Sequence, residues 1–367
     1  MKLGFLYAGG RLERLQELAK DPHAVPSDFF YGALELAAEG HEIFYDEIRE
    51  ERASKLLHWI DSLWGLRFAV RFSAAHFFSC LSHLKKWNSC DCVVATNSRA
   101  GMSLGLLRKL GWLRAPVAAI HCGIVNHAQI TSRLKATEPL LREQEIILFA
   151  ESERPSMQEL FAVPTDHFHI CNFGVDTAFW NAGAELGEFA FAVGNDSRRD
   201  FETFAKAASL SPHPHKLLTR IPLKTPPPPN LEHIRSAWCN AAISDADLRE
   251  IYTHSRCVVV PLEDSLQPAG QSVTLQAMAC ARPVIMTRTR GYWLHPDFED
   301  GRHLFLVVPG DTDALAQKIR CLMENPAEAQ RMGQSGREMM LRHYSIQHFA
   351  DGVKSACMAA IQKNHHS

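Results

Sequence analysis

Two hydrophobic patterns alternate along the chain. Short apolar runs typical of buried strands stand at Leu3–Tyr7, His41–Tyr45, Cys92–Thr96, Pro116–Ile120 and Ile146–Ala150. Segments with helical periodicity lie among them, at Tyr31–Glu39, Met102–Leu110 and Arg154–Phe161. Strands that alternate with helices predict a mostly parallel sheet with helices on both faces, which is an α/β fold.

The pattern restarts near Phe189. Strands are predicted at Phe189–Val193, His215–Leu218, Cys257–Pro261 and Pro283–Met286. Helices are predicted at Phe201–Ala208, Leu248–His254, Val273–Cys280, Thr312–Met323 and Ala327–His343, the last with possible break points at Gly333 and Gly336. We therefore expect two Rossmann-like domains, 1–172 and 188–345, joined by a linker over 173–187.

Charge and composition exclude several classes of protein. The 39 basic and 41 acidic residues leave a net charge of −2, which argues against a nucleic-acid binder with a broad cationic face. Neither a membrane-spanning segment nor a secretory signal stands out, so a cytoplasmic protein with reduced cysteines is expected. Cys90 and Cys92 are too close together for the usual zinc pair, and no second pair follows, so no metal site is expected.

The segment Lys55–Trp87 differs from the rest of the first domain. It is rich in Leu, Phe and Trp and carries five basic residues against the single acid Asp61. A basic amphipathic helix pair can lie on an anionic membrane surface, so peripheral membrane contact through 55–87 is one interpretation. Two helices packed over the sheet of the first domain are the other.

Candidate binding residues follow the predicted strands. In open parallel sheets, ligands bind outside the carboxyl ends of the strands. That rule selects Gly9 and Gly10, His121, the Gly194–Arg199 turn and Gly270–Ser272. If the two domains face each other, these segments line one cleft.

Two of these segments suit a diphosphate. Arg198 and Arg199 follow a strand that ends at Gly194, and guanidinium groups give paired hydrogen bonds to phosphate oxygens. Gly270, Gln271 and Ser272 open a helix whose free N–H groups and dipole favour an anion, and Gln276 is placed to bind sugar hydroxyls. A capping turn with solvated arginines and an ordinary helix start are the alternatives for these two segments.

His121 ends a predicted buried strand, which makes it a candidate catalytic residue, although a structural histidine is an equal alternative. The chain has no P-loop, no G-x-S-x-G elbow and no H-E-x-x-H motif, and no G-x-G-x-x-G follows the first strand. These absences weaken the case for a nucleotide hydrolase, a serine hydrolase, a zinc protease or a nicotinamide dehydrogenase.

The second half of the chain resembles a known family. Asn172–Thr177, a strand ending in Gly194, Ser265–Ile285 and Pro309-Gly-Asp311 are similar to the family 4 retaining glycosyltransferases of group 1 type, which have the two-domain GT-B fold. The resemblance implies two Rossmann-like domains facing across a cleft, with an acceptor domain first and a nucleotide-sugar domain second. It also implies that a last helix over 346–367 packs back on the first domain.

The resemblance assigns roles and also shows departures. Arg199 matches the lysine of the family that holds the diphosphate, Arg198 stands in for its arginine, and His121 matches a histidine near the donor sugar. The two glutamates of the Glu-x7-Glu motif fall on Pro268 and Gln276. An amide can replace the second glutamate at the ribose, whereas proline cannot replace the first at the sugar.

The activity that the resemblance implies is transfer of a sugar from a nucleoside-diphosphate sugar to a glycan, lipid-linked or small-molecule acceptor. Retention, independence of metal and the absence of any cofactor besides the donor substrate are expected. The alternatives are a nucleotide-sugar-binding protein that has lost catalysis, for which the missing glutamates argue, and a nucleotide-sugar epimerase on the same fold.

Overall fold

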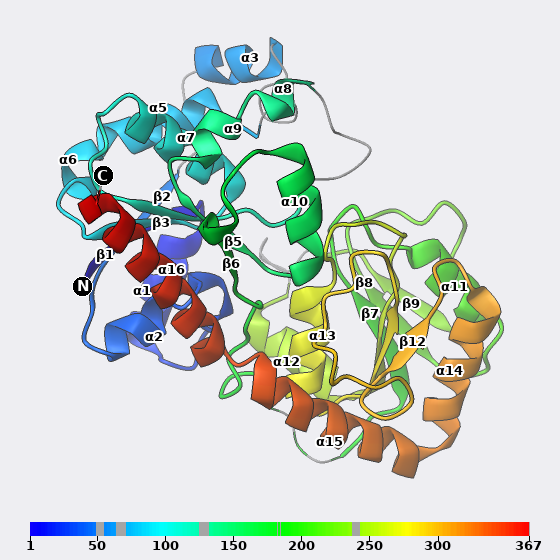
Figure 1. The fold of residues 1–367 in the computed structure, drawn as a ribbon. Helices are drawn as coiled ribbons and strands as arrows, with labels where there is room; N and C mark the ends of the chain where they lie inside the picture. The colour runs from blue at the N-terminus through cyan, green and yellow to red at the C-terminus, as the bar shows by residue number, and fades with distance from the viewer. Residues whose placement is uncertain are drawn as a thin grey trace. The chain divides into compact units, whose positions relative to one another are not determined.

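The computed structural model describes residues 1–48, 55–63, 71–124, 132–181, 183, 185–236 and 243–366 (Figure 1). The chain divides into two compact units. Unit 1 contains residues 1–22, 27–172 and 346–367, and unit 2 contains residues 23–26 and 173–345.

Unit 1 is built on a six-stranded sheet in the order β2-β1-β3-β4-β5-β6, in which every neighbouring pair is parallel. The strands are β1 (Lys2–Ala8), β2 (Glu42–Ile48), β3 (Cys92–Ala95), β4 (Val117–Ile120), β5 (Glu145–Leu148) and β6 (Phe168–Ile170). The central strands β3, β4 and β5 are buried along their whole length, as parallel strands covered on both faces must be.

Helices cover this sheet. They are α1 (Arg11–Lys20), α2 (Ala33–Ala38), α3 (Lys55–Leu63), α5 (Ala74–Ser82), α6 (Leu84–Trp87), α7 (Ser98–Lys109), α8 (Ser132–Lys135), α9 (Glu138–Leu141), α10 (Arg154–Leu160) and α16 (Ile346–His366). The long α16 packs on β3, β4, β5 and β6, so the last 21 helical residues of the chain complete the first unit. Figure 1 shows this helix in red along the sheet.

Unit 2 repeats the plan with a second parallel sheet in the order β12-β11-β10-β7-β8-β9. Its strands are β7 (Phe189–Val193), β8 (His215–Leu218), β9 (Leu231–Ile234), β10 (Ser255–Val260), β11 (Val284–Thr287) and β12 (Phe305–Val307). Its helices are α11 (Phe201–Ser209), α12 (Asp245–Thr253), α13 (Gln271–Ala279), α14 (Thr312–Glu324) and α15 (Pro326–His343). The expectation of two Rossmann-like α/β domains is confirmed.

Most differences from the predicted elements concern short or exposed ones. Helix α1, which has no buried residue, and the three-residue strands β6 and β12 were not predicted. The helix predicted over Tyr31–Glu39 is a 3-10 turn at Asp28–Phe30 followed by the short α2. Helix α12 begins with a capping box, in which the side chains of Ser244 and Asp247 each accept from the backbone N–H of the other.

A buried arginine holds the segment that leads into unit 2. Arg282 is 1% exposed, and its guanidinium donates to the carbonyl oxygens of Cys280, Gly183 and Glu185 at 2.6–2.9 Å. Three carbonyl acceptors offset part of the cost of burying the charge. Arg282 therefore fastens the predicted linker to the body of unit 2.

Helix α15 runs unbroken through Gly333 and Gly336, so the predicted break is wrong. A Cβ atom at Gly333 would overlap the carbonyl oxygen of Ala281, and one at Gly336 would lie 2.6 Å from the carbonyl oxygen of His303. Glycine is needed at both positions because backbone from neighbouring segments approaches the helix there.

We expect Gly333→Ala to lower the free energy of unfolding by roughly 1–3 kcal/mol, because the added methyl group overpacks this contact. In an open helix the same change would stabilise by about 1 kcal/mol. Urea denaturation measures the difference, with Gln334→Ala on the exposed side of α15 as the control. A stabilised Gly333→Ala variant would contradict the close approach.

Candidate functional site

The carboxyl edge of the second sheet gathers the residues that the sequence analysis selected there. Strand β7 leads into Gly194, which has a φ of +149°. A Cβ atom at Gly194 would lie 2.5 Å from Nε of Arg199, so the guanidinium packs directly on the glycine backbone. Only glycine leaves room for this arginine at the end of β7.

Arg199 is fixed from both sides. Residues 198–200 pair with residues 261–263 after β10, through the bridge of Arg199 with Leu262 and two further backbone hydrogen bonds. Its Nε donates to Oδ2 of Asp196 at 2.6 Å. The side chain is only 3% exposed, and its Nη1 has no hydrogen-bond partner among the described residues. A buried, charged donor is therefore left unsatisfied, which is costly unless a ligand completes it.

The amino end of α13 lies beside this guanidinium. Gly270 precedes the helix with a φ of +75°, and its Cβ position is 3.8 Å from Nη1 of Arg199. No side chain caps α13, so the N–H groups of its first turn stay available. Nε2 of Gln271 is also buried without a partner among the described residues, and Ser272 is half-buried beside it.

Arg198 completes the group of donors. Its Nε is buried without a partner in the described part of the chain, while its carbonyl oxygen accepts from the N–H of Glu263. Gly194, Arg199 and Gly270 lie together at this edge of the sheet. Buried donors without a partner among the described residues on Arg198, Arg199 and Gln271, together with an uncapped helix start, are features that suit an anion.

Gln276 does not join this group. It is 3% exposed, and its Oε1 accepts from the hydroxyl of Tyr252 on α12 at 3.3 Å. The amide is thus used inside unit 2, and the expected contact with ribose hydroxyls does not fit this placement. Pro268 is buried, and the nearby acid Asp264 pairs with Arg290 at 2.8 Å.

The prediction that Gly9 and Gly10 in unit 1 bind a ligand also needs correction. Gly10 precedes α1 with a φ of +87°, but the first-turn N–H groups of Arg11 and Leu12 both donate to Oε2 of Glu47 at 3.0 Å. This carboxylate from β2 takes the place that a ligand anion was expected to have. The sequence offered no signal for a cap 36 residues away.

His121 lies at the end of β4 with no exposed surface. Its Nε2 lies 3.3 Å from Oε1 of Gln144, whose own Nε2 donates to the carbonyl oxygen of Leu140. Oε1 is therefore the acceptor, and Nε2 of His121 carries the hydrogen. Burial lowers the pKa of His121 to about 4, so the imidazole is neutral. This position supports the structural alternative rather than contact with a sugar hydroxyl.

Glu153 is a buried acid that the sequence analysis did not select. It accepts from the N–H of Gly123 at 2.6 Å and from that of Phe149 at 3.3 Å, so it joins the ends of β4 and β5. Burial raises the pKa of Glu153 to about 7, although hydrogen bonds from the backbone oppose the shift. Glu153 positions the turn that follows His121.

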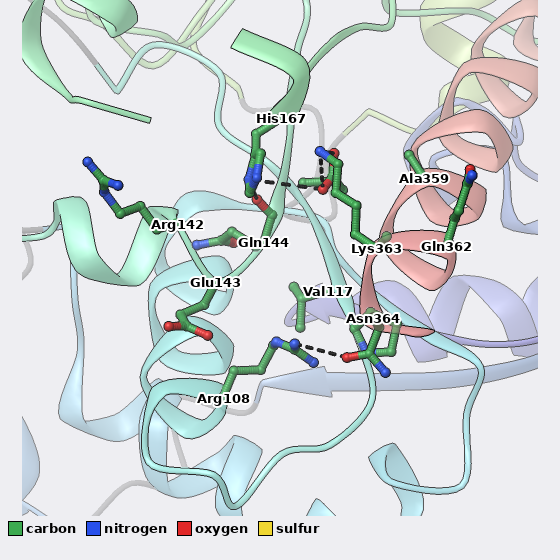
Figure 2. Close-up of a pocket in the computed structure, with 13 residues that line it drawn as sticks. Arg108, Val117, Arg142, Glu143, Gln144, His167, Ala359, Gln362, Lys363 and Asn364 are labelled. Carbon is green, nitrogen blue, oxygen red and sulfur yellow. Dashed lines mark hydrogen bonds and ion pairs between the residues drawn. The ribbon is translucent and has the colours of Figure 1, made fainter. Parts of the chain in front are cut away.

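A cavity of about 650 Å³ lies at the opposite edge of the first sheet, where β4 and β5 begin (Figure 2). Lys363 of α16 reaches across it to Glu145 at 3.0 Å, and Arg108 donates to Asn364 at 3.1 Å. These contacts join α16 to the sheet. Because parallel sheets bind ligands at the carboxyl ends of their strands, we do not assign the donor to this cavity.

Solved structures of other proteins share the fold. The sucrose-phosphate synthase of Thermosynechococcus elongatus matches with a TM-score of 0.72 and 15% identity over 100% of both chains. HepE of Anabaena, solved in complex with UDP, matches with a TM-score of 0.65 and 13% identity over 98% of this chain and 100% of its own. The structure is thus a GT-B fold.

Sequence comparison finds similarity to glycosyltransferases. Residues 232–325 match the family described as Glycosyl transferases group 1. The alpha-maltose-1-phosphate synthase of Mycolicibacterium smegmatis is 27% identical over 52% of this chain and 56% of its own length, so the match spans about half of that relative. The putative glycosyltransferase EpsD of Bacillus subtilis is 37% identical over 18% of this chain and 17% of its own. The similarity to group 1 glycosyltransferases is thus shown for part of the chain, residues 232–325.

The raised pKa of Glu153 predicts a pH effect on stability. Between its usual pKa of 4.5 and about 7, the folded protein keeps a proton that the unfolded chain has released. The contribution of protonated Glu153 to the free energy of unfolding is complete below pH 4.5 and is lost as the pH rises through 7. Glutamine cannot ionise at this position. The Tm of Glu153→Gln should therefore fall less between pH 5 and pH 8 than the Tm of the unsubstituted protein.

Thermal unfolding at both pH values measures this difference. Glu159→Gln, at an exposed position of α10, is the matched control and should follow the unsubstituted protein. Equal losses in all three proteins would show that Glu153 is not a buried, proton-binding acid.

Proposed function

We propose that this protein transfers a glycosyl group from a nucleoside-diphosphate sugar to an acceptor hydroxyl, with retention at the anomeric carbon. The observation that carries the proposal is the set of buried, unsatisfied donors on Arg198, Arg199 and Gln271 beside the uncapped start of α13. A diphosphate supplies the oxygens and the negative charge that this group lacks.

The chemistry follows from where charge develops. The bond between the anomeric carbon and the diphosphate oxygen breaks, the sugar becomes oxocarbenium-like, and negative charge grows on the leaving group. Arg198, Arg199 and the dipole of α13 stabilise that charge, and they do so in the position that a metal ion would otherwise take. The acceptor oxygen bonds to the same face of the sugar, and its proton passes to the leaving diphosphate oxygen. No further cofactor is proposed.

UDP is the first nucleotide to test, because HepE, with the same fold, was solved with UDP and with UDP-glucose. We propose that unit 1 binds the acceptor, and that the acceptor is a glycan, a lipid-linked sugar or a small molecule. A cytoplasmic location and a part in polysaccharide synthesis are consistent with such substrates.

A second candidate is a nucleotide-sugar-binding protein without transferase activity. It is favoured by Pro268 and Gln276, which stand buried where the family resemblance places two glutamates. Both candidates bind the donor, and they differ in turnover. Release of UDP from UDP-sugars in the presence of an acceptor extract supports transfer, whereas donor binding without turnover supports the second candidate.

Arg199→Ala should weaken UDP binding by roughly 1.5–3 kcal/mol, the contribution of hydrogen bonds to a charged group. Arg199→Lys should recover only part of the affinity, because an ammonium group keeps the charge without the paired geometry. Isothermal titration calorimetry measures both. Arg302→Ala removes an exposed arginine of the same unit, paired with Glu299, and should bind UDP normally. Unchanged affinity in Arg199→Ala would remove this residue from the site.

We also propose peripheral membrane contact through residues 55–87. Residues 64–70 of this segment lie outside the described residues. Helix α3 exposes Leu56 and Trp59, one turn apart, at 60% and 58%, and α5 exposes Phe78 at 50%. Asp61, on the buried side of α3, accepts from the N–H of Ala74 and fixes α3 to α5. The apolar pair therefore points away from the unit. In the described part of the chain, no helix is long and apolar enough to cross a bilayer.

Flotation with anionic liposomes tests this surface. The double variant Leu56→Ser, Trp59→Ser should lose most of its binding, because these side chains supply the buried apolar area. Trp112→Ser changes another half-exposed tryptophan of unit 1 and should float like the unsubstituted protein. Equal flotation of both variants would exclude α3 as the membrane contact.

A further inference from the structure

Two histidines and an aspartate meet in unit 2, away from the residues assigned to the donor. His295 and Asp297 lie in the loop after β11, and His343 is the last residue of α15. One ligand atom from each lies within 4.8 Å of the others. Nδ1 of His295 is 3.5 Å and Nε2 of His343 is 3.6 Å from the same oxygen, Oδ2 of Asp297.

These separations are close to those of a tetrahedral zinc centre. With bonds of about 2.0–2.1 Å to imidazole nitrogen and carboxylate oxygen, adjacent ligand atoms of a tetrahedron are about 3.3–3.4 Å apart. Two of the three edges are within a few tenths of an ångström of that length. The two imidazole rings stack at 4.0 Å with an angle of 11°, so both present an edge toward Asp297.

The protonation states also suit a metal ion. The N–H of Asp297 lies 3.3 Å from Nδ1 of His295, and a backbone N–H can only donate, so this nitrogen holds a lone pair. A bound ion would take this lone pair over from the N–H of Asp297, and the Asp297 oxygen beside it would supply negative charge. The carboxyl end of the 18-residue α15 adds a negative dipole end at His343.

The surrounding structure holds the ligands in place. The hydroxyl of the buried Tyr344 accepts from the N–H of His295 at 2.6 Å and lies 3.3 Å from the carbonyl oxygen of Trp293. Nε1 of Trp293 donates to the carbonyl oxygen of Ala269, the residue before Gly270. The loop is thus already tied to α15 on one side and to the start of α13 on the other.

We propose that His295, Asp297 and His343 bind one zinc ion, which fastens this loop to the end of α15. Asp297 is 61% exposed, so water can take the fourth position. The role is structural: the ion holds the loop that supports Ala269, and it takes no part in glycosyl transfer. The site is independent of the proposed function, because its ligands are outside the donor group.

Zinc titration by calorimetry tests the proposal, with the metal alone as ligand. His365 and His366 can themselves bind zinc, so every protein tested carries His365→Ala and His366→Ala. One equivalent should bind and raise the Tm. Co²⁺ should give the intense visible absorption of a tetrahedral site with nitrogen and oxygen ligands.

Asp297→Asn and His343→Ala should each weaken zinc binding at least tenfold and abolish the zinc-dependent rise in Tm. Asp297→Asn changes an exposed side chain and keeps its size, so it separates loss of a ligand from loss of folding. His254→Ala, an exposed histidine at the end of α12, is the control and should bind zinc normally. Failure to bind zinc, or equal zinc affinity in all three variants, would overturn the proposal.

Discussion

The guanidinium of Arg199, pressed between the backbone of Gly194 and the start of α13, is the feature on which the function of unit 2 depends. Both glycines are required by contact: a Cβ at Gly194 would meet the guanidinium, and one at Gly270 would meet Val260 at 2.6 Å. Asp196 neutralises part of the charge and sets the orientation. Nη1 of Arg199 is left as a donor that is buried from water and lies near the uncapped start of α13.

This arrangement is costly in the absence of a ligand. A buried charge with an unsatisfied donor costs on the order of 1–3 kcal/mol for the missing hydrogen bond alone. The fold accepts that cost because the pairing of residues 198–200 with 261–263 fixes the backbone on both sides of Arg199. Donors held in this way need little reorganisation when charge develops on a leaving diphosphate, which is the main requirement for electrostatic catalysis.

The sequence predicts the buried elements well and the exposed or distant ones poorly. Strands β7 and β8 have the predicted bounds, because continuous apolar runs mark buried parallel strands. Helix α1 buries no residue, and it was missed although Leu12, Leu15 and Leu18 stand at helical spacing. In the site, Arg199 and Gly270 follow from strand ends, but the burial of His121 and the bond of Gln276 to Tyr252 are tertiary facts. The zinc ligands were missed because His343 is 46 residues from Asp297, outside any short motif.

The two units use the same turn in opposite ways. In each, a strand leads to a glycine with positive φ that precedes a helix, and both helix starts lack a side-chain cap of their own. At α1, Glu47 from β2 supplies a carboxylate, so the dipole is already neutralised by the protein. At α13, the neighbouring charged group is Arg199, which adds positive charge to the positive end of the dipole. An anion is thus redundant at the start of α1 and favoured at the start of α13, which supports the proposed position of the diphosphate in unit 2.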